Sequence, residues 1–392
     1  MTAFDLSTCA RPNILKLVPY RCARDDYKDD GTNILLDANE NAFGPSLPSN
    51  LSLTSTLPTS TLHRYPDPHQ HALKQKFCNL RGGALTPSNL FLGVGSDEAI
   101  DALLRAFCIP GKDKILTCPP TYGMYAVSAC VNDIDIVKVP LKVTEPGFPV
   151  DVDAIERVLS ETEGIKLVYL CSPGNPTGSL VDPEAVKRLL AHPTWNGVVV
   201  VDEAYVDFAP QGSSLAPWVT EYPNLVVMQT LSKAFGLAGI RLGAAFTSVE
   251  IAKLLNSLKA PYSVSSPTSE LAMVALTEES GLKVQRQNVE GILRQRDRLV
   301  QELPKIEGIG RFLGGFESNF LLCEMLDRSG KPSNVVAEKV YAQLAETRGV
   351  VVRFRGKELG CEGCLRITIG TGEENDRLLE RLAEVLKQVR EE

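Results

Sequence analysis

A lysine stands among small and apolar residues in the stretch TLSKAFGLAGIRLG, residues 230–243. A lysine that is desolvated near other cations has a lowered pKa, so the neutral, nucleophilic amine of Lys233 becomes available. Ser232 and Arg241 lie in the same stretch and are suitable donors to a dianionic phosphate, which arginine binds through two parallel hydrogen bonds. The stretch therefore predicts a nucleophile beside a phosphate site.

A carboxylate follows four consecutive valines in the stretch VVVVDEAYVDF. Asp202 is therefore expected to be buried, and a buried carboxylate needs a cation or a hydrogen-bond donor, or it takes up a proton. Beside a pyridine ring it would keep the ring nitrogen protonated; a helix-capping aspartate is the alternative. Tyr205 follows closely enough to reach the same ligand.

Three further side-chain groups lie near expected turns. In FLGVGSDEAI, glycines lead into a helix whose first-turn amides suit a phosphate, with Ser96 and Asp97 as cap candidates; a plain capped helix is the alternative. Tyr122 in PPTYGMY is placed either to lie on a flat ligand or to pack in the core. Asn175 in CSPGNPTG is either a turn former or an amide presented to a ligand.

A nucleophilic lysine, a carboxylate for a pyridinium nitrogen and donors to a phosphate together describe a binding site for pyridoxal phosphate. A nucleotide-binding module fits less well, because GVGSDEAI matches neither G-x-G-x-x-G nor the Gly-Lys-Ser/Thr ending of a P-loop. That alternative also leaves Lys233 and Asp202 without roles.

The elements that position these residues alternate between strands and helices, with a helical pattern at 183–192. Near-continuous apolar strands of this kind predict an α/β fold with a mainly parallel sheet covered on both faces. Ligands of such sheets bind beyond the carboxyl ends of the strands, so the polar residues there are expected to converge. The expected strands are 114–120, 135–141, 165–170, 197–205, 224–233 and 242–247.

The pattern changes after about residue 275, where a long charged helix is expected at 283–306, followed by strand-like FLLCEML, VVVRF and CLRITIG and a closing amphipathic helix. We predict three segments: an N-terminal arm that is part of a small domain (1–59), a large cofactor-binding domain (60–275) and a C-terminal small domain (276–392). Residues 46–62, rich in Ser, Thr and Pro, are expected to form a surface loop.

The composition excludes several classes of protein. The 392 residues are 44% hydrophobic and carry a net charge of −7 without a basic stripe, which argues against nucleic-acid binding. There is no run of about 18 apolar residues to span a membrane and no secretory signal in the first residues. The ten cysteines are mostly scattered, as in a reducing compartment, so a cytoplasmic location is expected. The Cys361/Cys364 pair lacks partners for a metal site, and we expect no bound metal.

The chain resembles the class I and II aminotransferases of the aspartate aminotransferase superfamily at SPGNPTG, VVDEAY and TLSKAFGLAGIRLG, and over nearly its whole length. Within that group it is most similar to the histidinol-phosphate aminotransferases, at LDANENAFGPS, RYPDP, GVGSDEAI, PPTYGMY and CLRITIGT. The resemblance implies fold type I: a three-layer αβα large domain with a mainly parallel, mostly seven-stranded sheet, plus a smaller α+β domain.

The resemblance also implies roles toward pyridoxal 5′-phosphate. Lys233 would hold the cofactor covalently, Asp202 would pair with its pyridine nitrogen, and Asn175 and Tyr205 would bond its ring hydroxyl. Tyr122 would stack on the ring. The groups expected around the cofactor phosphate are Gly95, Ser96, Asp97, Thr230, Ser232, Arg241 and, across a homodimer interface, Tyr65.

The activity implied is amino transfer between L-histidinol phosphate and 2-oxoglutarate, a step of histidine biosynthesis. Arg366 would bind the substrate anion with help from Arg353 and Tyr20. The other residues expected on the substrate side are Asn39, Glu40, Tyr65 and Asn175. Two alternatives keep the cofactor: an aminotransferase for aromatic or other amino acids, and a decarboxylase of a phosphorylated amino acid.

Overall fold

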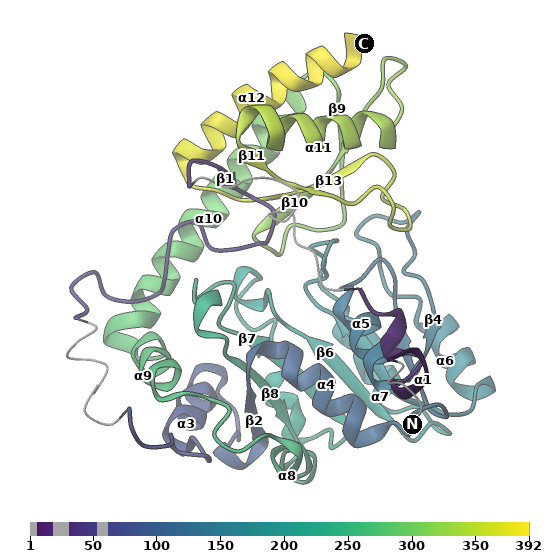
Figure 1. Ribbon diagram of the computed structural model, residues 1–392, viewed down its shortest axis with the longest axis vertical. Coiled ribbons are helices and arrows are strands. Elements are labelled where there is room, and N and C mark those ends of the chain that lie inside the picture. Colours follow the sequence, from purple (N-terminus) through teal and green to yellow (C-terminus); the bar gives the residue numbers. More distant parts are fainter. Residues whose placement is uncertain (1–5, 19–30, 53–61, 392) are drawn as a thin grey trace, which may run out of the picture.

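The computed structural model describes residues 6–18, 31–52 and 62–391 (Figure 1). Its larger part surrounds a seven-stranded sheet, and its smaller part, at the top of Figure 1, surrounds a four-stranded antiparallel sheet. Helix α10 (Lys283–Glu302) runs from one part to the other. Of the expected loop at 46–62, residues 53–61 lie outside the described residues.

The large sheet confirms the predicted α/β class. Only β8 runs antiparallel to its neighbours, and the pairs among β7, β6, β5, β3 and β4 are all parallel. All six expected strands are present: five are shorter than the apolar run that predicts them, and the one expected at 165–170 extends one residue further, to Cys171. The short edge strand β2 was not predicted. The strands in sheet order are β2 (Leu90–Gly93), β8 (Gly243–Thr247), β7 (Leu225–Thr230), β6 (Val198–Asp202), β5 (Ile165–Cys171), β3 (Lys114–Thr117) and β4 (Asp135–Lys138).

Helices cover both faces of this sheet because its strands are apolar on both sides. In β6, Val198 and Val200 pack into one core, while Val199 and Val201 pack into the core on the opposite face. The first core is covered by α4 (Gly95–Phe107), α5 (Met124–Asn132) and α8 (Val249–Leu258). The second is covered by α3 (His71–Arg81), α6 (Val152–Glu161), α7 (Pro183–Leu190) and α9 (Ser266–Ala275).

The smaller part combines the C-terminal third with the N-terminal arm. In the arm, β1 (Ile34–Leu35) pairs in parallel with β11 (Val350–Val351). The four-stranded sheet has the order β12 (Arg353–Phe354), β13 (Cys364–Thr368), β10 (Phe320–Met325) and β9 (Ile309–Leu313). Its helices are α11 (Asn334–Arg348) and α12 (Gly372–Glu391). The short helix α1 (Leu6–Cys9) lies instead against the larger part (Figure 1), where Nδ2 of nearby Asn13 donates to the carbonyl of Cys130 on α5 at 2.8 Å.

Within the described ranges, the helices are either too short or too polar to cross a membrane.

Candidate active site

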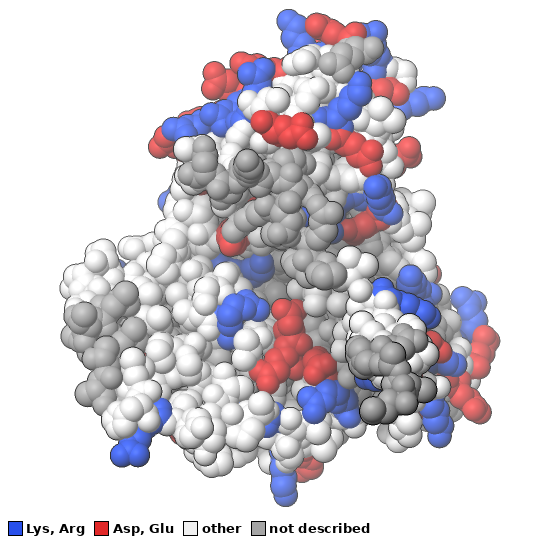
Figure 2. Space-filling model, viewed as in Figure 1, with Lys and Arg blue, Asp and Glu red and all other residues white. Residues whose placement is uncertain are grey.

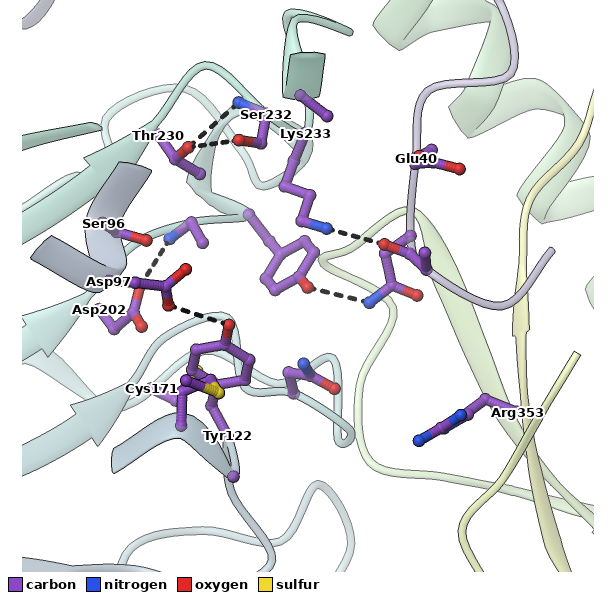
Figure 3. Close-up of a pocket in the computed structure, with 18 of the residues that line it drawn as sticks. Glu40, Ser96, Asp97, Tyr122, Cys171, Asp202, Thr230, Ser232, Lys233 and Arg353 are labelled. Atoms are coloured by element: carbon purple, nitrogen blue, oxygen red, sulfur yellow. Dashed lines mark hydrogen bonds between the residues drawn. The ribbon is translucent and has the colours of Figure 1, made fainter. Parts of the chain in front are cut away.

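A cavity of about 590 Å³ opens where the large sheet, the N-terminal arm and the small sheet meet (Figure 3). The carboxyl ends of β5, β6 and β7 contribute Cys171, Asp202 and Thr230 to its wall, as expected for the ligand site of a parallel sheet. The structure brings most of the residues singled out in the sequence to this cavity: Asn39, Glu40, Ser96, Asp97, Tyr122, Asn175, Asp202, Tyr205, Thr230, Ser232, Lys233, Arg241, Arg353 and Arg366.

The side chain of Lys233 reaches into the cavity from the turn that follows β7, and its amine meets the backbone of the arm (Figure 3). Its Nζ donates a hydrogen bond of 2.8 Å to the carbonyl oxygen of Ala38. Burial, and then the nearby Arg366 guanidinium, lower the pKa of Lys233 to about 8. The neutral form of the amine, which a nucleophile or a proton acceptor requires, is therefore much more accessible near neutral pH than in an ordinary lysine.

The arm holds the turn that carries Lys233. The amide of Ser46 donates to the carbonyl of Phe235 at 2.8 Å, and Nδ2 of Asn41 donates to the carbonyl of Ala234 at 3.0 Å. Gly236 has a φ of +63°, and a Cβ at that position would lie 2.2 Å from the carbonyl oxygen of Gly44. Only glycine allows this close approach in this conformation.

Asp202 lies at the end of β6 with 2% of its surface exposed. Its carboxylate accepts hydrogen bonds from the Tyr125 hydroxyl at 2.7 Å and from the Ala204 amide at 3.2 Å. Burial raises the pKa of Asp202 to about 6, and the hydrogen bond from Tyr125 acts in the opposite direction. A cationic ring nitrogen would stabilise this carboxylate, because an opposite charge lowers the cost of a buried anion.

A set of donors suited to phosphate gathers around the Ser232 hydroxyl in the cavity wall. Thr230 donates to the Ser232 hydroxyl at 2.9 Å, and Nη1 of Arg241 lies 3.4 Å from the same oxygen. The first turn of α4 adjoins this group: a Cβ on Gly95, whose φ is +73°, would lie 2.5 Å from Nη2 of Arg241. Backbone amides at a helix N-terminus and a guanidinium form an anion site together.

The expected capping roles of Ser96 and Asp97 are wrong. Helix α4 begins at Gly95, so both residues lie inside its first turn, and Val94 occupies the cap position without a side-chain hydrogen bond. The Asp97 carboxylate instead accepts a hydrogen bond from the Tyr122 hydroxyl at 3.1 Å and lies 3.5 Å from Arg241. Gly95 has a positive φ, which glycine adopts readily, so the chain turns at Gly95 and Ser96 and Asp97 follow inside the first turn.

Arginines line the side of the cavity formed by the small sheet. Arg366 of β13 is buried; its Nη1 donates to Oδ1 of Asn175 at 2.7 Å and its Nη2 donates to the carbonyl of Asp37. Burial, followed by Arg355 and then Arg353, disfavours the charged form and lowers the pKa of Arg366 to about 9. Arg353 is the register partner of Arg366 across the β12–β13 pair. This concentration of positive charge would be relieved by an anion.

The residues present fit pyridoxal phosphate on three observations. A partly neutral amine, a buried carboxylate with a raised pKa, and a helix N-terminus with an adjacent guanidinium all face one cavity. These are the three kinds of group that a planar ring with a covalent attachment and a phosphate tail requires.

Tyr65 and Tyr20 are not part of this assembly. Tyr65 is 81% exposed and stacks on Tyr262 with ring centroids 4.5 Å apart, away from the cavity lining. Tyr20 lies outside the described residues.

Two residues of the site were missed in the sequence. Tyr125 lies behind the cavity wall, where it donates to Asp202. It belongs to the motif PPTYGMY, in which a role was predicted only for Tyr122. Arg355 lines the cavity and pairs with Glu358 at 2.6 Å, two residues after the predicted Arg353. Arg353 was expected from the resemblance alone; because residues two apart on a strand share a face, the same stretch could have pointed to Arg355 as well.

The cysteines of the C-x-x-C motif are also accounted for. Cys361 and Cys364 are fully buried free thiols that pack with Phe148 and Leu322. Burial raises the pKa of both thiols, Cys361 to about 12, so they are poor nucleophiles.

Comparison with known proteins gives consistent matches. The family model for aminotransferase class I and II matches residues 32–382. A histidinol-phosphate aminotransferase of Schizosaccharomyces pombe is 53% identical over 393 residues, which cover 98% of each chain.

Solved structures match the fold. The histidinol-phosphate aminotransferase from Sinorhizobium meliloti in complex with pyridoxal-5′-phosphate superposes with a TM-score of 0.83 at 23% identity, covering 99% of both chains. An L-threonine-O-3-phosphate decarboxylase from Porphyromonas gingivalis superposes with a TM-score of 0.71 at 19% identity, covering 90% of this chain and 99% of that one. The fold alone therefore does not separate amino transfer from decarboxylation.

Proposed function

Since this chain belongs to the class I and II aminotransferases, we propose that it uses pyridoxal 5′-phosphate to transfer the amino group of L-histidinol phosphate to 2-oxoglutarate, in histidine biosynthesis. Identity of 53% over nearly the full length supports this substrate pair over the alternatives. The observation that carries the proposal is that Lys233, Asp202 and Arg366 face one cavity, each with a pKa displaced by burial.

We propose that the cofactor is held along the length of this cavity. Lys233 provides the covalent attachment, Asp202 holds the proton on the pyridine nitrogen, and Tyr122 packs against the ring. Asn175 and Tyr205 bind the ring hydroxyl. The groups assigned to the cofactor phosphate are Gly95, Ser96, Asp97, Thr230, Ser232 and Arg241.

When bound, the cofactor accepts the substrate amino group and holds the electron pair that is left when the adjacent carbon loses its proton. Lys233 moves that proton, because its lowered pKa lets the same amine accept it and return it near neutral pH. Asp202 favours the cationic ring by its fixed negative charge in a water-poor site.

The arginine side of the cavity suits two different anions. Histidinol phosphate carries a phosphate and no α-carboxylate, whereas glutamate carries carboxylates, and a planar guanidinium forks to either. We assign this binding to Arg366 with Arg353, and add Arg355 because it lines the same cavity. Two further residues line this side of the cavity: Glu40 from the arm, and Asn175 from the turn after β5.

We also propose a homodimer in which Tyr65 completes the partner's site. Tyr65 and Tyr262 form an exposed aromatic pair, and Figure 2 shows few charged side chains on the face over α3 and α9. Exposed aromatic pairs of this kind are typical of interfaces. Mixing inactive Tyr65→Phe and Lys233→Ala chains is expected to restore part of the activity through hybrid dimers; no recovery in a mixed dimer would refute the shared site.

A cytoplasmic location is proposed on the state of the cysteines. Those described are free thiols, most of them buried, which suits a reducing compartment. Cell fractionation with an antibody to the chain tests this location.

The function is tested by absorbance and product assays on the yellow holoprotein. Histidinol phosphate is expected to shift the visible absorbance whereas histidine is not, and 2-oxoglutarate is expected to restore the band with formation of glutamate. Release of carbon dioxide from a phosphorylated amino acid without consumption of 2-oxoglutarate would establish the decarboxylase instead. Preference for an aromatic amino donor in direct competition would establish the other aminotransferase.

A further inference from the structure

Asn39 is a buried residue of the arm that joins both parts of the molecule. It is 1% exposed, and its Nδ2 donates to the Tyr205 hydroxyl oxygen at 2.9 Å in the large part. In the small part, its backbone carbonyl accepts from Nδ2 of Asn319 at 3.1 Å. Its φ of +53° is a conformation that asparagine tolerates better than most residues.

Thr368 of β13 decides which way the Asn39 amide points. The backbone amide of Asn39 donates to Oγ1 of Thr368 at 3.1 Å, and Oγ1 of Thr368 donates to Oδ1 of Asn39, also at 3.1 Å. A hydroxyl has one proton to donate, and here Oδ1 of Asn39 receives it. Rotating the amide by 180° would remove that acceptor from a buried hydroxyl, so the arrangement with Nδ2 facing Tyr205 is favoured.

The direction of this hydrogen bond determines what Tyr205 can do. Because Asn39 donates to the Tyr205 oxygen, the single phenolic proton is directed elsewhere. Tyr205 lines the cavity, and none of the residues that the structure describes accepts its proton. Its hydroxyl is therefore set to donate to a ligand.

We infer that Asn39 and Thr368 are positioning residues that orient the Tyr205 proton toward the ring oxygen of the cofactor. This rests on the proposed function, in which Tyr205 binds that oxygen, and it gives Asn39 a role other than the substrate contact expected from the sequence. It also ties the orientation of a group in the large part to Thr368, which lies in the small sheet two residues after Arg366.

The test is the pH midpoint of the visible band of the bound cofactor, measured with the holoprotein. A hydrogen bond to an anionic oxygen favours the form that has lost a proton. In Thr368→Val the Asn39 amide is free to turn and to accept the Tyr205 proton, so the midpoint is expected to rise by about one pH unit. Thr368→Ser keeps the hydroxyl and is expected to keep the midpoint.

The effect must pass through Tyr205. In a Tyr205→Phe background, Thr368→Val is expected to leave the midpoint where Tyr205→Phe alone puts it. An equal rise in both backgrounds, or a well-folded holo Thr368→Val chain with an unchanged midpoint, overturns the inference. The dissociation constant of the cofactor, measured on the apoprotein by fluorescence, gives a second readout: it is expected to increase in Thr368→Val and not in Thr368→Ser.

A second variant covers the case in which Thr368→Val does not fold. Asn39→Asp places an acceptor toward Tyr205 and is expected to raise the midpoint more in the native background than in Tyr205→Phe. An equal rise of the midpoint in the two backgrounds would mean that Asn39→Asp acts only through its added negative charge and not through Tyr205, which would overturn the inference. If the unsubstituted chain shows no visible band with added pyridoxal phosphate, the proposed function itself fails, which is a different result from any of these.

Discussion

The hydroxyl of Tyr125 donates a hydrogen bond of 2.7 Å to the carboxylate of Asp202, and both side chains are buried. Tyr125 is held from behind by Tyr169, whose ring stacks on it with centroids 4.7 Å apart. The bond lowers the pKa of Asp202, whereas burial raises it to about 6 overall. The proton affinity of the site's central acid is thus set by two opposing local causes.

The first prediction concerns the pH dependence of stability without cofactor. The pKa of Asp202 is about 6 in the folded chain, against about 4 when unfolded, so the folded state binds more protons between these values. Stability is therefore expected to fall as pH rises through this window. Asp202→Asn should reduce that fall by on the order of 2 kcal/mol. Urea unfolding of the two apoproteins at about pH 4 and about pH 7 measures the difference.

Tyr125→Phe provides the matched change in the opposite direction. It removes a donor to the carboxylate, so the pKa of Asp202 should rise. The pH range over which the free energy of unfolding falls should then extend to higher pH. Identical pH profiles for all three apoproteins would contradict the assignment of this dependence to Asp202.

The second prediction concerns the nucleophile. Reduction of the holoprotein with borohydride should fix the cofactor to Lys233, and peptide mapping should find the modification there. Lys233→Ala should lose the tag and lose turnover by a factor of about 10² to 10⁴, the usual contribution of a positioned acid–base group. A tag on another lysine, or normal turnover in Lys233→Ala, would refute the role.

The third prediction concerns anion binding. Arg366→Lys cannot reproduce the planar fork and would leave Oδ1 of Asn175 without its donor. We expect kcat/KM to fall about 10- to 100-fold with both histidinol phosphate and 2-oxoglutarate. Arg311→Lys is the matched control, because Arg311 is an exposed arginine of β9 that pairs with Glu324 of β10; it should leave both values unchanged. Equal losses in the two variants would mean that the effect is not specific to the cavity.

The sequence was sufficient for six of the seven strands of the large sheet and for the residues at the ends of its central strands. Apolar runs mark buried parallel strands, and each run closes on a residue that must face the ligand edge, as Asp202 and Thr230 do. The Lys233 turn follows from the same logic, because it continues directly from β7.

Contacts between distant segments could not be found this way. Tyr125 is 77 residues from Asp202, and Thr368 is 329 residues from Asn39, so nothing local signals either hydrogen bond. The caps assigned to Ser96 and Asp97 failed for a local reason: the chain turns at Gly95, and Val94, two residues before Ser96, takes the cap position. The roles of Tyr125 and Thr368 therefore depend on how the folded chain brings distant segments together.

The last prediction tests how the arm holds the lysine turn. Gly236→Ala introduces a methyl group 2.2 Å from the carbonyl of Gly44 in a backbone conformation that alanine disfavours. Gly212→Ala is strained in φ alone, since its position is open, so it separates the two effects. We expect Gly236→Ala to lower the free energy of unfolding by about 1–3 kcal/mol more than Gly212→Ala and to weaken cofactor binding. Equal losses in the two variants would show that contact with the arm does not hold Lys233 in place.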